Sequence, residues 1–413
     1  MNGSKLRGPR VAIFGMDGLI IIKGWRKRDM SNLIATRTNE GAAAHKVPFV
    51  SYGVTRAAGE VMTGHFGHTG HEAVGGDNIF RIASMTKPIV TMAALQLVEA
   101  GKLDLHAPAK NILPMLGEVD VLVGEAAADM KTVGLARDIT LHHLLTHTSG
   151  YAYDFHSDKI MAQVQAGKVP PLAVDNNDFL RAPLISQPGD NWEYGIGVDF
   201  VGQMIEAVSG QDLETYLREM IFEPLSMTCT SFRASVVGAD KIVPLGARSA
   251  DGTITDLTAM MPLIDSPPYS GGGGLYSNVT DYMKFMRVLL NGEQGPSGRI
   301  LGADGVHMMQ TNQIGDLLVP LQPTMNEMLC SEHEWFPGVI NRWSYGLLIN
   351  ESDVPGRRKA GSCAWSGLNC TYFFVDPKSD IGGVVMMQML PVYNPASLSV
   401  FEAFEKAIYE TDL

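Results

Sequence analysis

Ser84 and Lys87 are the residues of this chain whose types and spacing suggest chemistry. They stand three positions apart in Ser84-Met85-Thr86-Lys87, and on a helix that spacing places both side chains on one face. A hydroxyl beside an amine is a nucleophile beside its base, the arrangement that covalent acyl transfer requires. Chance supplies a serine three positions before a lysine about once in a chain of this composition, and this chain holds no second instance.

The residues around this pair argue against the simpler explanation, a helix-capping serine followed by a surface lysine. The segment from Pro88 to Glu99 is apolar on nearly all faces and Gly101 follows it, so we predict a buried helix ended by a glycine. A lysine one turn into such a helix needs a partner, because an unpaired buried charge is costly. Ser84 would stand at the helix N-terminus, where backbone N–H groups favour developing negative charge.

The elements that must position this pair come from both ends of the chain. Strands are predicted at 47–67, as a hairpin with Gly59 at its turn, and at 370–376 and 381–390. Helices are predicted after Thr140, at 199–209 before Gly210, from Asp212 to a stop at Pro224, at 281–290 and at 398–409. The order of these elements predicts a sheet made from both chain ends, with a helical insertion between them.

Four segments together resemble the serine β-lactamase-like and penicillin-binding-protein superfamily, and most closely its family VIII carboxylesterases. They are the run 80–105 around the Ser84/Lys87 pair, LHHLLTHTSG at 141–150, PGDNWEYGIGVDFVGQMIEAVSG at 188–210, and SGGGGLYSNVTDYMKF at 270–285. The resemblance implies an α/β (α+β) fold, with an antiparallel sheet flanked by helices and an inserted helical domain. The expected divisions are a discontinuous sheet domain at 31–105 and 271–413, a helical domain at 106–270, and an N-terminal extension at 1–30.

The resemblance also implies a catalytic tyrosine. Tyr194, in Trp192-Glu193-Tyr194-Gly195, would stand near Ser84 and Lys87 and share the proton transfers with them. A lysine ammonium beside Tyr194 would favour its phenolate and lower its pKa. Without the resemblance, a tyrosine in this setting would be interpreted as a core or cleft-wall aromatic.

A third motif is expected on a strand that faces the nucleophile. Trp365-Ser366-Gly367 looks like the esterase version of that motif. The backbone N–H groups of Ser84 and of Leu368, the residue after the motif, would then form the oxyanion hole, each donor contributing about 3 kcal/mol. Trp365, Ser366 and Gly367 of this motif, together with Ile196, are also expected to bind substrate, although Trp365 could equally be a packing residue.

Two departures from the β-lactamase pattern bear on the substrate. The tyrosine motif of those enzymes is Tyr-x-Asn, whereas Ile196 stands here in place of the amide. Trp365 stands where their strand motif has a lysine, so the cation that would meet a β-lactam carboxylate is missing. Both changes favour esters with less polar acyl groups over lactams.

The sequence therefore predicts a serine carboxylesterase that forms a Ser84 acyl-enzyme and uses Lys87 and Tyr194 as its proton relay. Three alternatives remain open at this point. One is an acyltransferase that passes the acyl group to an alcohol or amine, and another is a β-lactamase or D-aminopeptidase-like amidase. The third is a sensor or binding protein that is acylated without turnover, because fold by itself is a poor guide to function.

Composition limits the partners. The 413 residues carry 32 basic and 44 acidic side chains, a net charge of −12, which disfavours nucleic acids and anionic membranes and suits a small-molecule ester. The four cysteines are too few and too scattered for a disulfide framework, which favours a cytoplasmic location over secretion. No cofactor is expected, and His143 and His147 lack the further ligands that a metal site needs. No run is long and apolar enough to span a membrane, and the pattern gives no oligomeric state.

Overall fold

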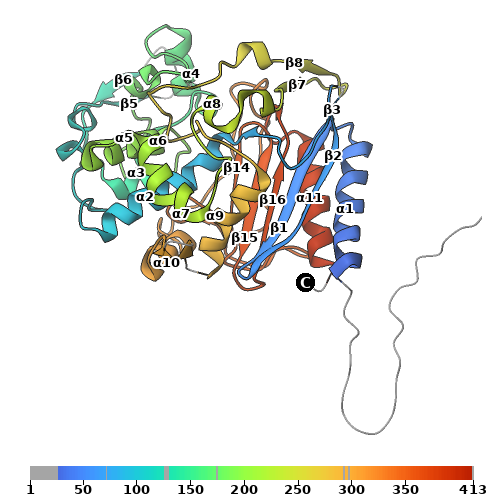
Figure 1. The fold of residues 1–413 in the computed structure, drawn as a ribbon. Helices are drawn as coiled ribbons and strands as arrows, with labels where there is room; N and C mark the ends of the chain where they lie inside the picture. Colours follow the sequence, from blue (N-terminus) through green and yellow to red (C-terminus); the bar gives the residue numbers. More distant parts are fainter. Residues whose placement is uncertain are drawn as a thin grey trace, which may run out of the picture.

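The centre of the fold is an eight-stranded sheet built from the two ends of the chain (Figure 1). The computed structural model describes residues 27–70, 72–124, 130–173, 175–291, 294–295 and 298–411, so most of the predicted extension at 1–30 lies outside it. The strand order is β12 (Asn341–Trp343), β13 (Leu348–Asn350), β14 (Cys363–Gly367), β15 (Thr371–Asp376), β16 (Ile381–Met386), β1 (Phe49–Arg56), β2 (Gly59–Thr69) and β3 (Glu72–Ala73). All neighbours pair antiparallel. The fold class predicted from the sequence is confirmed.

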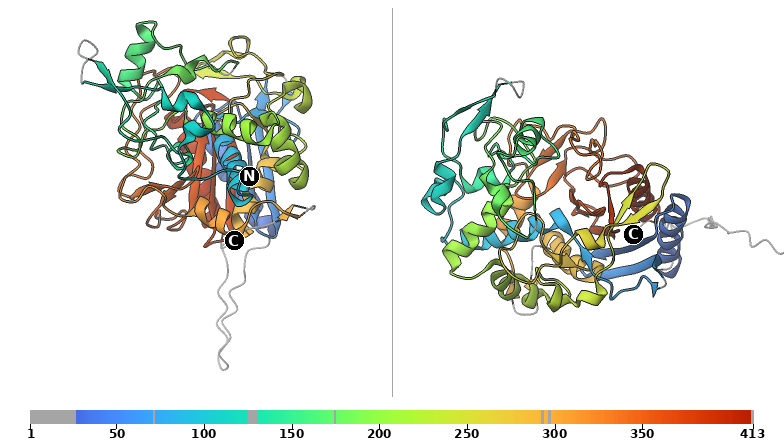
Figure 2. Two further views of the ribbon diagram at one scale, coloured as in Figure 1. Left: turned by 90° about the vertical axis from the view of Figure 1, so that its left-hand side faces the viewer. Right: turned by 90° about the horizontal axis from the view of Figure 1, so that it is seen from above.

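Helices cover both faces of this sheet. On one face α1 (Lys27–Ala44) packs beside α11 (Pro395–Tyr409), and on the other α9 (Val279–Asn291) lies across β1 and β16 (Figures 1 and 2). Every residue of β15 and β16 is buried, because both of their faces are covered, and this explains why their sequences are mostly apolar, with Thr371 and Asp376 only at the ends of β15. The approach of α9 is close: a Cβ at Gly53 of β1 would lie 2.6 Å from Val279 Cγ1.

The middle of the chain forms the cluster of short helices that carries part of the site. It contains α3 (Leu141–Leu145), α4 (Asp158–Gln165), α5 (Gly197–Ser209) and α6 (Leu213–Leu217). As predicted, Thr140 caps α3 by accepting a hydrogen bond from the His143 N–H, and Gly210 ends α5 with a φ of 73°. The predicted buried helix is α2 (Thr86–Glu99), which packs against α5.

Several local features of the structure differ from the sequence prediction. Two hairpins were missed, β5 (Val121–Val123) with β6 (Lys131–Val133) and β7 (Gly246–Arg248) with β8 (Ile254–Asp256). The strand predicted at 381–390 breaks after β16, and its end, β17 (Met389–Leu390), pairs parallel with β7. Pro224 does not stop the helix after Asp212, which continues through a π turn into α7 (Glu223–Leu225), whose first turn tolerates a proline. Helix α1 was also missed, because it is largely polar and buries few residues, among them Ile34 and Ala42.

No helix within the described ranges is long and apolar enough to cross a membrane.

The sheet from both chain ends and the helical middle segment agree with the predicted organisation, while the domain boundaries themselves stay predictions.

A buried ion pair joins α11 to the segment that leads into β14. Arg358 and Glu405 are both fully buried, and Arg358 Nε and a terminal nitrogen donate to the two Glu405 carboxylate oxygens at 2.7 and 3.0 Å. Such a two-point pair fixes both distance and orientation. It therefore holds the start of β14, the strand that carries the third predicted motif, against the C-terminal helix.

Breaking this pair should cost stability. We expect Glu405→Ala to lower the free energy of unfolding by about 3–5 kcal/mol, because it leaves a buried guanidinium without its counter-ion. The matched control is Glu402→Ala on the same helix, whose half-exposed carboxylate pairs with Arg357 and Lys406 and should contribute less than about 1 kcal/mol. Urea unfolding followed by circular dichroism measures both. Equal, small losses would contradict the role assigned to the pair.

Candidate active site

Ser84 stands in a 3-10 turn, η1 (Ala83–Met85), that runs directly into α2. The turn is strained, because Ala83 has a φ of 43°, in the left-handed region that costs a residue with a Cβ on the order of 1–3 kcal/mol. Neighbouring elements hold it in place: Tyr282 on α9 donates a hydrogen bond to the Met85 carbonyl, and the Thr86 hydroxyl accepts one from the Leu275 N–H. The serine hydroxyl is thereby presented at a fixed position on the rim of a pocket.

Lys87 lies one turn further on and is fully buried. Its Nζ has three oxygen neighbours, the Ser84 hydroxyl at 3.1 Å, the Tyr153 hydroxyl at 2.9 Å and the Gly272 carbonyl at 2.6 Å. The predicted pairing of Ser84 with Lys87 is therefore present in the geometry. The lysine is also the point at which α2, the middle segment and the glycine-rich segment meet.

The buried position decides the charge of this amine. Burial lowers the Lys87 pKa to about 7, against the raising effect of the Asp199 carboxylate. A neutral amine has two N–H donors and one lone pair. Because the Gly272 carbonyl can only accept and Tyr153 offers an oxygen for the second N–H, the lone pair remains for the Ser84 O–H. The arrangement suits proton transfer from Ser84 to Lys87.

Tyr153 is a member of the site that the sequence analysis missed. Its hydroxyl, rather than that of Tyr194, binds Lys87, and burial raises its pKa well above the usual value, so it is a phenol. The residue stands three positions after the end of the segment 141–150 that carried part of the family resemblance. The only signal in the sequence was that two tyrosines, Tyr151 and Tyr153, follow this segment. Nothing in the local sequence shows which of them belongs to the site.

Tyr194 is held by a cage of aromatic side chains. The Trp365 indole N–H donates to the Tyr194 hydroxyl at 3.0 Å, and the rings of His147 and Trp365 each lie with centroids 4.8 Å from the tyrosine ring. Lys87 Nζ lies 5.0 Å from the centre of the Tyr194 ring. Burial raises the Tyr194 pKa above its usual 10, and a hydrogen bond with Ser84 lowers it by less. The expected lowering of the pKa by a lysine ammonium is absent, because the amine beside it is buried and favours its neutral form.

Asp199 is the second residue that the sequence analysis did not single out. It lies in the first turn of α5, fully buried, and its Oδ1 accepts hydrogen bonds from the Ser270 hydroxyl at 2.6 Å and from the Gly272 N–H at 2.9 Å. The carbonyl of that same glycine holds Lys87. A Cβ at Gly272 would lie 2.3 Å from Asp199 Oδ2, so the close approach requires glycine. The glycine run 270–274 thus makes a close backbone contact at Gly272.

The residues of the strand motif have two different roles, because some line the pocket and others pack behind it. Ser366 and Leu368 line the pocket, and the Ser366 hydroxyl hydrogen-bonds that of Tyr393 at 2.6 Å. Trp365 is buried behind Tyr194 and does not line the pocket, so its expected direct contact with substrate is wrong. Gly367 packs against backbone instead, since a Cβ there would lie 2.2 Å from the Ile82 carbonyl oxygen.

Ile196 is also displaced from its predicted role. It lines a second, smaller cavity that lies behind Tyr153 and Leu172, rather than the pocket at Ser84. The position that would hold an amide in the β-lactamase pattern therefore faces away from the nucleophile in this chain.

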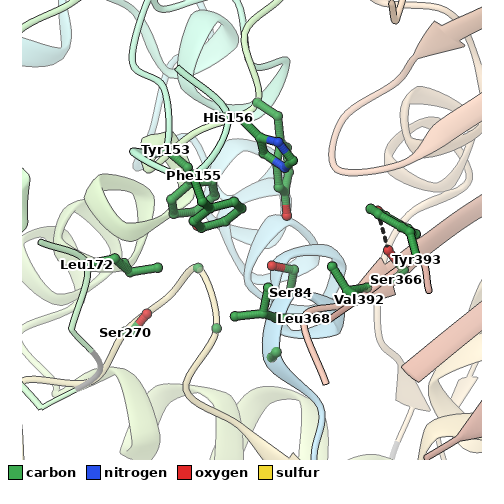
Figure 3. Close-up of a pocket in the computed structure, with 14 residues that line it drawn as sticks. Ser84, Tyr153, Phe155, His156, Leu172, Ser270, Ser366, Leu368, Val392 and Tyr393 are labelled. Atoms are coloured by element: carbon green, nitrogen blue, oxygen red, sulfur yellow. Dashed lines mark hydrogen bonds between the residues drawn. The ribbon is translucent and has the colours of Figure 1, made fainter. Parts of the chain in front are cut away.

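The pocket above Ser84 opens to solvent, and its empty space is about 560 Å³ when the open mouth is included (Figure 3). Its walls carry four large apolar side chains, Phe155, Leu172, Leu368 and Val392, together with the methyl group of Ala83 and the rings of Tyr153 and Tyr194. The remaining polar side chains of the lining are His156, Ser270, Ser366 and Tyr393. No lysine, arginine or carboxylate belongs to the described lining, so the pocket suits a largely apolar, uncharged group.

The histidines considered for a metal are accounted for otherwise. His147 is buried against the aromatic cage, and the His143 ring accepts from the Thr140 N–H. Within the described ranges, no group of three or more His, Cys, Asp or Glu side chains is placed to hold a metal ion.

Comparison with known proteins agrees with this geometry. Residues 34–396 match the Beta-lactamase family. A monacolin J acid methylbutanoyltransferase of Aspergillus terreus is 32% identical over 349 residues, covering 81% of this chain and 82% of that protein. A lovastatin esterase of Penicillium rubens is 30% identical over 366 residues, covering 81% and 85%. A mutant simvastatin synthase from Aspergillus terreus superposes with a TM-score of 0.80 at 28% identity, covering 93% of this chain and 98% of that one.

Removal of the Tyr153 hydroxyl should reduce catalysis. We expect Tyr153→Phe to lower kcat/KM for a p-nitrophenyl ester about 10- to 100-fold, because it leaves a buried N–H of Lys87 without its acceptor. Tyr151→Phe is the matched control, since Tyr151 lies two positions away but stacks on Phe200 outside the pocket lining. If the two variants behave alike, Tyr153 has no special part in the site.

The rate should depend on pH through Lys87. We expect kcat/KM to rise with unit slope up to about pH 7 and then level off, because only the neutral amine can take the Ser84 proton. Asp199→Asn removes the negative charge that raises the Lys87 pKa, so the midpoint should move to lower pH. The asparagine retains an oxygen for the Ser270 and Gly272 bonds. A midpoint that stays in place, or moves upward, would contradict this assignment.

Proposed function

The chain belongs to the Beta-lactamase family and is a serine enzyme of the hydrolase and acyl-transfer type, and from this premise we propose that it is an acyltransferase. Ser84 would take an acyl group from an ester or thioester and pass it to an alcohol. This was an alternative in the sequence analysis, where hydrolysis of esters was preferred. The similarity to a methylbutanoyltransferase and to a simvastatin synthase supports the alternative more strongly.

The first half-reaction would acylate Ser84. Its oxygen attacks the acyl carbonyl while the hydroxyl proton passes to the neutral Lys87 amine, as the 3.1 Å separation allows. The N–H groups of Ser84 and Leu368 would receive the developing negative charge. As the carbonyl–leaving group bond breaks, the leaving atom takes a proton from the Tyr194 phenol, and the proton held by Lys87 restores the phenol. The net change is one new Ser84–acyl bond and one protonated leaving group.

The second half-reaction would reverse these roles. An acceptor alcohol enters beside Tyr194 and gives its proton to the Tyr194/Lys87 pair as its oxygen attacks the acyl-enzyme. The Ser84 oxygen leaves and recovers a proton from Lys87. The product is the ester of the acceptor, and the enzyme returns to its starting state.

The observation that carries the proposal is the apolar lining of the pocket. Phe155, Leu172, Leu368 and Val392 surround the nucleophile with hydrocarbon, which disfavours water and favours an organic acceptor. The acyl group is proposed to be small and branched or short, in keeping with the pocket size and with the name of the methylbutanoyltransferase relative.

Hydrolysis is the second candidate, because a lovastatin esterase is similar over most of its length. The two activities share the acyl-enzyme and differ in whether water or an alcohol removes the acyl group. A β-lactamase or amidase activity is less well supported, because no cationic side chain is part of the described lining to meet a carboxylate. A sensor without turnover is disfavoured by the intact contacts of Ser84 with Lys87.

An acyl-thioester assay separates transfer from hydrolysis. We expect a 2-methylbutanoyl thioester to acylate the wild-type protein, seen as a mass increase of one acyl group, and Ser84→Ala to show none. Addition of an alcohol should then speed loss of the adduct at least about tenfold and produce the new ester, since an alcohol enters an apolar pocket more readily than water does. Monacolin J acid and simple primary alcohols serve as acceptors. Adduct loss at an unchanged rate, with only free acid formed, would favour the hydrolase.

A further inference from the structure

His156 contributes a ring nitrogen to the wall of the pocket. The proposed mechanism assigns no role to this atom. The residue lines the same cavity as Ser84, and in Figure 3 its imidazole extends into the space on the far side from Leu368. The ring lies against Phe155 and near Tyr194, with centroids 4.6 and 6.0 Å away. It is therefore fixed between an apolar wall and the catalytic tyrosine.

A single hydrogen bond settles which nitrogen of this ring carries the proton. His156 Nδ1 lies 2.7 Å from the Pro323 carbonyl oxygen, and a carbonyl can only accept, so Nδ1 is the N–H. Burial lowers the His156 pKa to about 4, so the ring is neutral at ordinary pH. Nε2 is then a lone-pair acceptor. No described residue is assigned a hydrogen bond to it, and it is not among the atoms that are fully shielded from solvent.

The other polar groups of the lining have partners of their own. The Ser366 and Tyr393 hydroxyls bind each other, and the Ser270 hydroxyl donates to Asp199. Nε2 of His156 is thus an acceptor without a protein donor in a pocket that is otherwise mostly apolar. An acceptor in such a place favours a ligand that brings a donor, because a ligand that covers Nε2 without donating to it would displace solvent and leave the nitrogen unpaired in the complex.

We propose that Nε2 of His156 accepts a hydrogen bond from a second hydroxyl or an N–H of the acyl acceptor, so that the enzyme selects acceptors that carry such a donor beside the reacting hydroxyl. The inference rests on the proposed acyl transfer and specifies its acceptor class. The bonded group is not the reacting hydroxyl, because that hydroxyl has one proton and must give it to the Tyr194/Lys87 pair. His156 is a specificity residue in this scheme and takes no part in proton transfer.

The test compares alcohols that differ only in a second hydroxyl. With a p-nitrophenyl butyrate donor, wild-type protein is given 1-hexanol and the hexanediols from 1,2 to 1,6, and kcat/KM for ester formation is measured for each. We expect at least one diol to exceed 1-hexanol about tenfold after correction for the number of primary hydroxyls. The ratio of the two acceptors is the readout, so a general loss of activity in a variant cancels.

Two variants separate recognition from support of the fold. His156→Asn places an amide N–H where Nδ1 bonds Pro323 but removes the acceptor at Nε2, and it should abolish the preference. His156→Gln places an oxygen near Nε2 and gives up the Pro323 bond, and it should keep most of the preference. Loss of the preference in both variants, or its survival in His156→Asn, overturns the inference.

The outcomes also distinguish a failure of the role proposed for His156 from a failure of the proposed acyl transfer. Transfer to 1-hexanol and to all diols at equal rates overturns the role of His156 and leaves acyl transfer standing. Hydrolysis of the donor with no transfer to any alcohol overturns the proposed function and this inference with it.

Discussion

The burial of one amine is the constraint on which the rest of the site depends. Lys87 lies wholly inside the protein, where a charged ammonium is costly, so the structure must supply it with partners and tolerate its neutral form. Those partners come from three separate parts of the chain: Ser84 one turn before it, Tyr153 in the middle segment, and the Gly272 carbonyl. The same environment that lowers the pKa makes this lysine a base near neutral pH, so the requirement for burial and the chemistry coincide.

Around this amine, the supporting residues act by fixing geometry. Asp199 anchors the peptide of Gly272, whose carbonyl in turn orients Lys87, and only glycine fits against the carboxylate. Trp365 approaches from β14 and holds the Tyr194 hydroxyl without touching the pocket. The turn that follows β14 is tied to the segment before the nucleophile, because the Asn369 amide donates to the Arg81 carbonyl at 3.2 Å. The sheet, α2 and the middle segment thus converge on one small volume.

Residue patterns by themselves predicted only the parts of this site that are local, whereas Tyr194 and the strand motif at 365–367 were predicted from the family resemblance. The spacing of Ser84 and Lys87 and the buried character of α2 are local patterns, and so are the strands whose order indicated a sheet from both chain ends. Tyr153, Asp199 and His156 depend on where α5, the glycine run and the loop at Pro323 meet in space, and no spacing along the chain encodes that. The prediction of a lowered pKa for the Tyr194 phenol was wrong for the same reason. Its pKa depends on how deeply the whole cluster is buried, which one segment cannot show.

Direct titration of the Lys87 side chain tests the central claim, that the buried amine is neutral and able to accept a proton. Lysine labelled with ¹³C and ¹⁵N, with the Lys87 signals assigned by their absence in Lys87→Ala, allows its Cε and Nζ shifts to be followed by NMR from pH 5 to 11. The structure predicts a single titration with a midpoint near pH 7. A midpoint at or above the ordinary lysine value of about 10.4 would show a permanent cation beside Ser84 and would contradict the account.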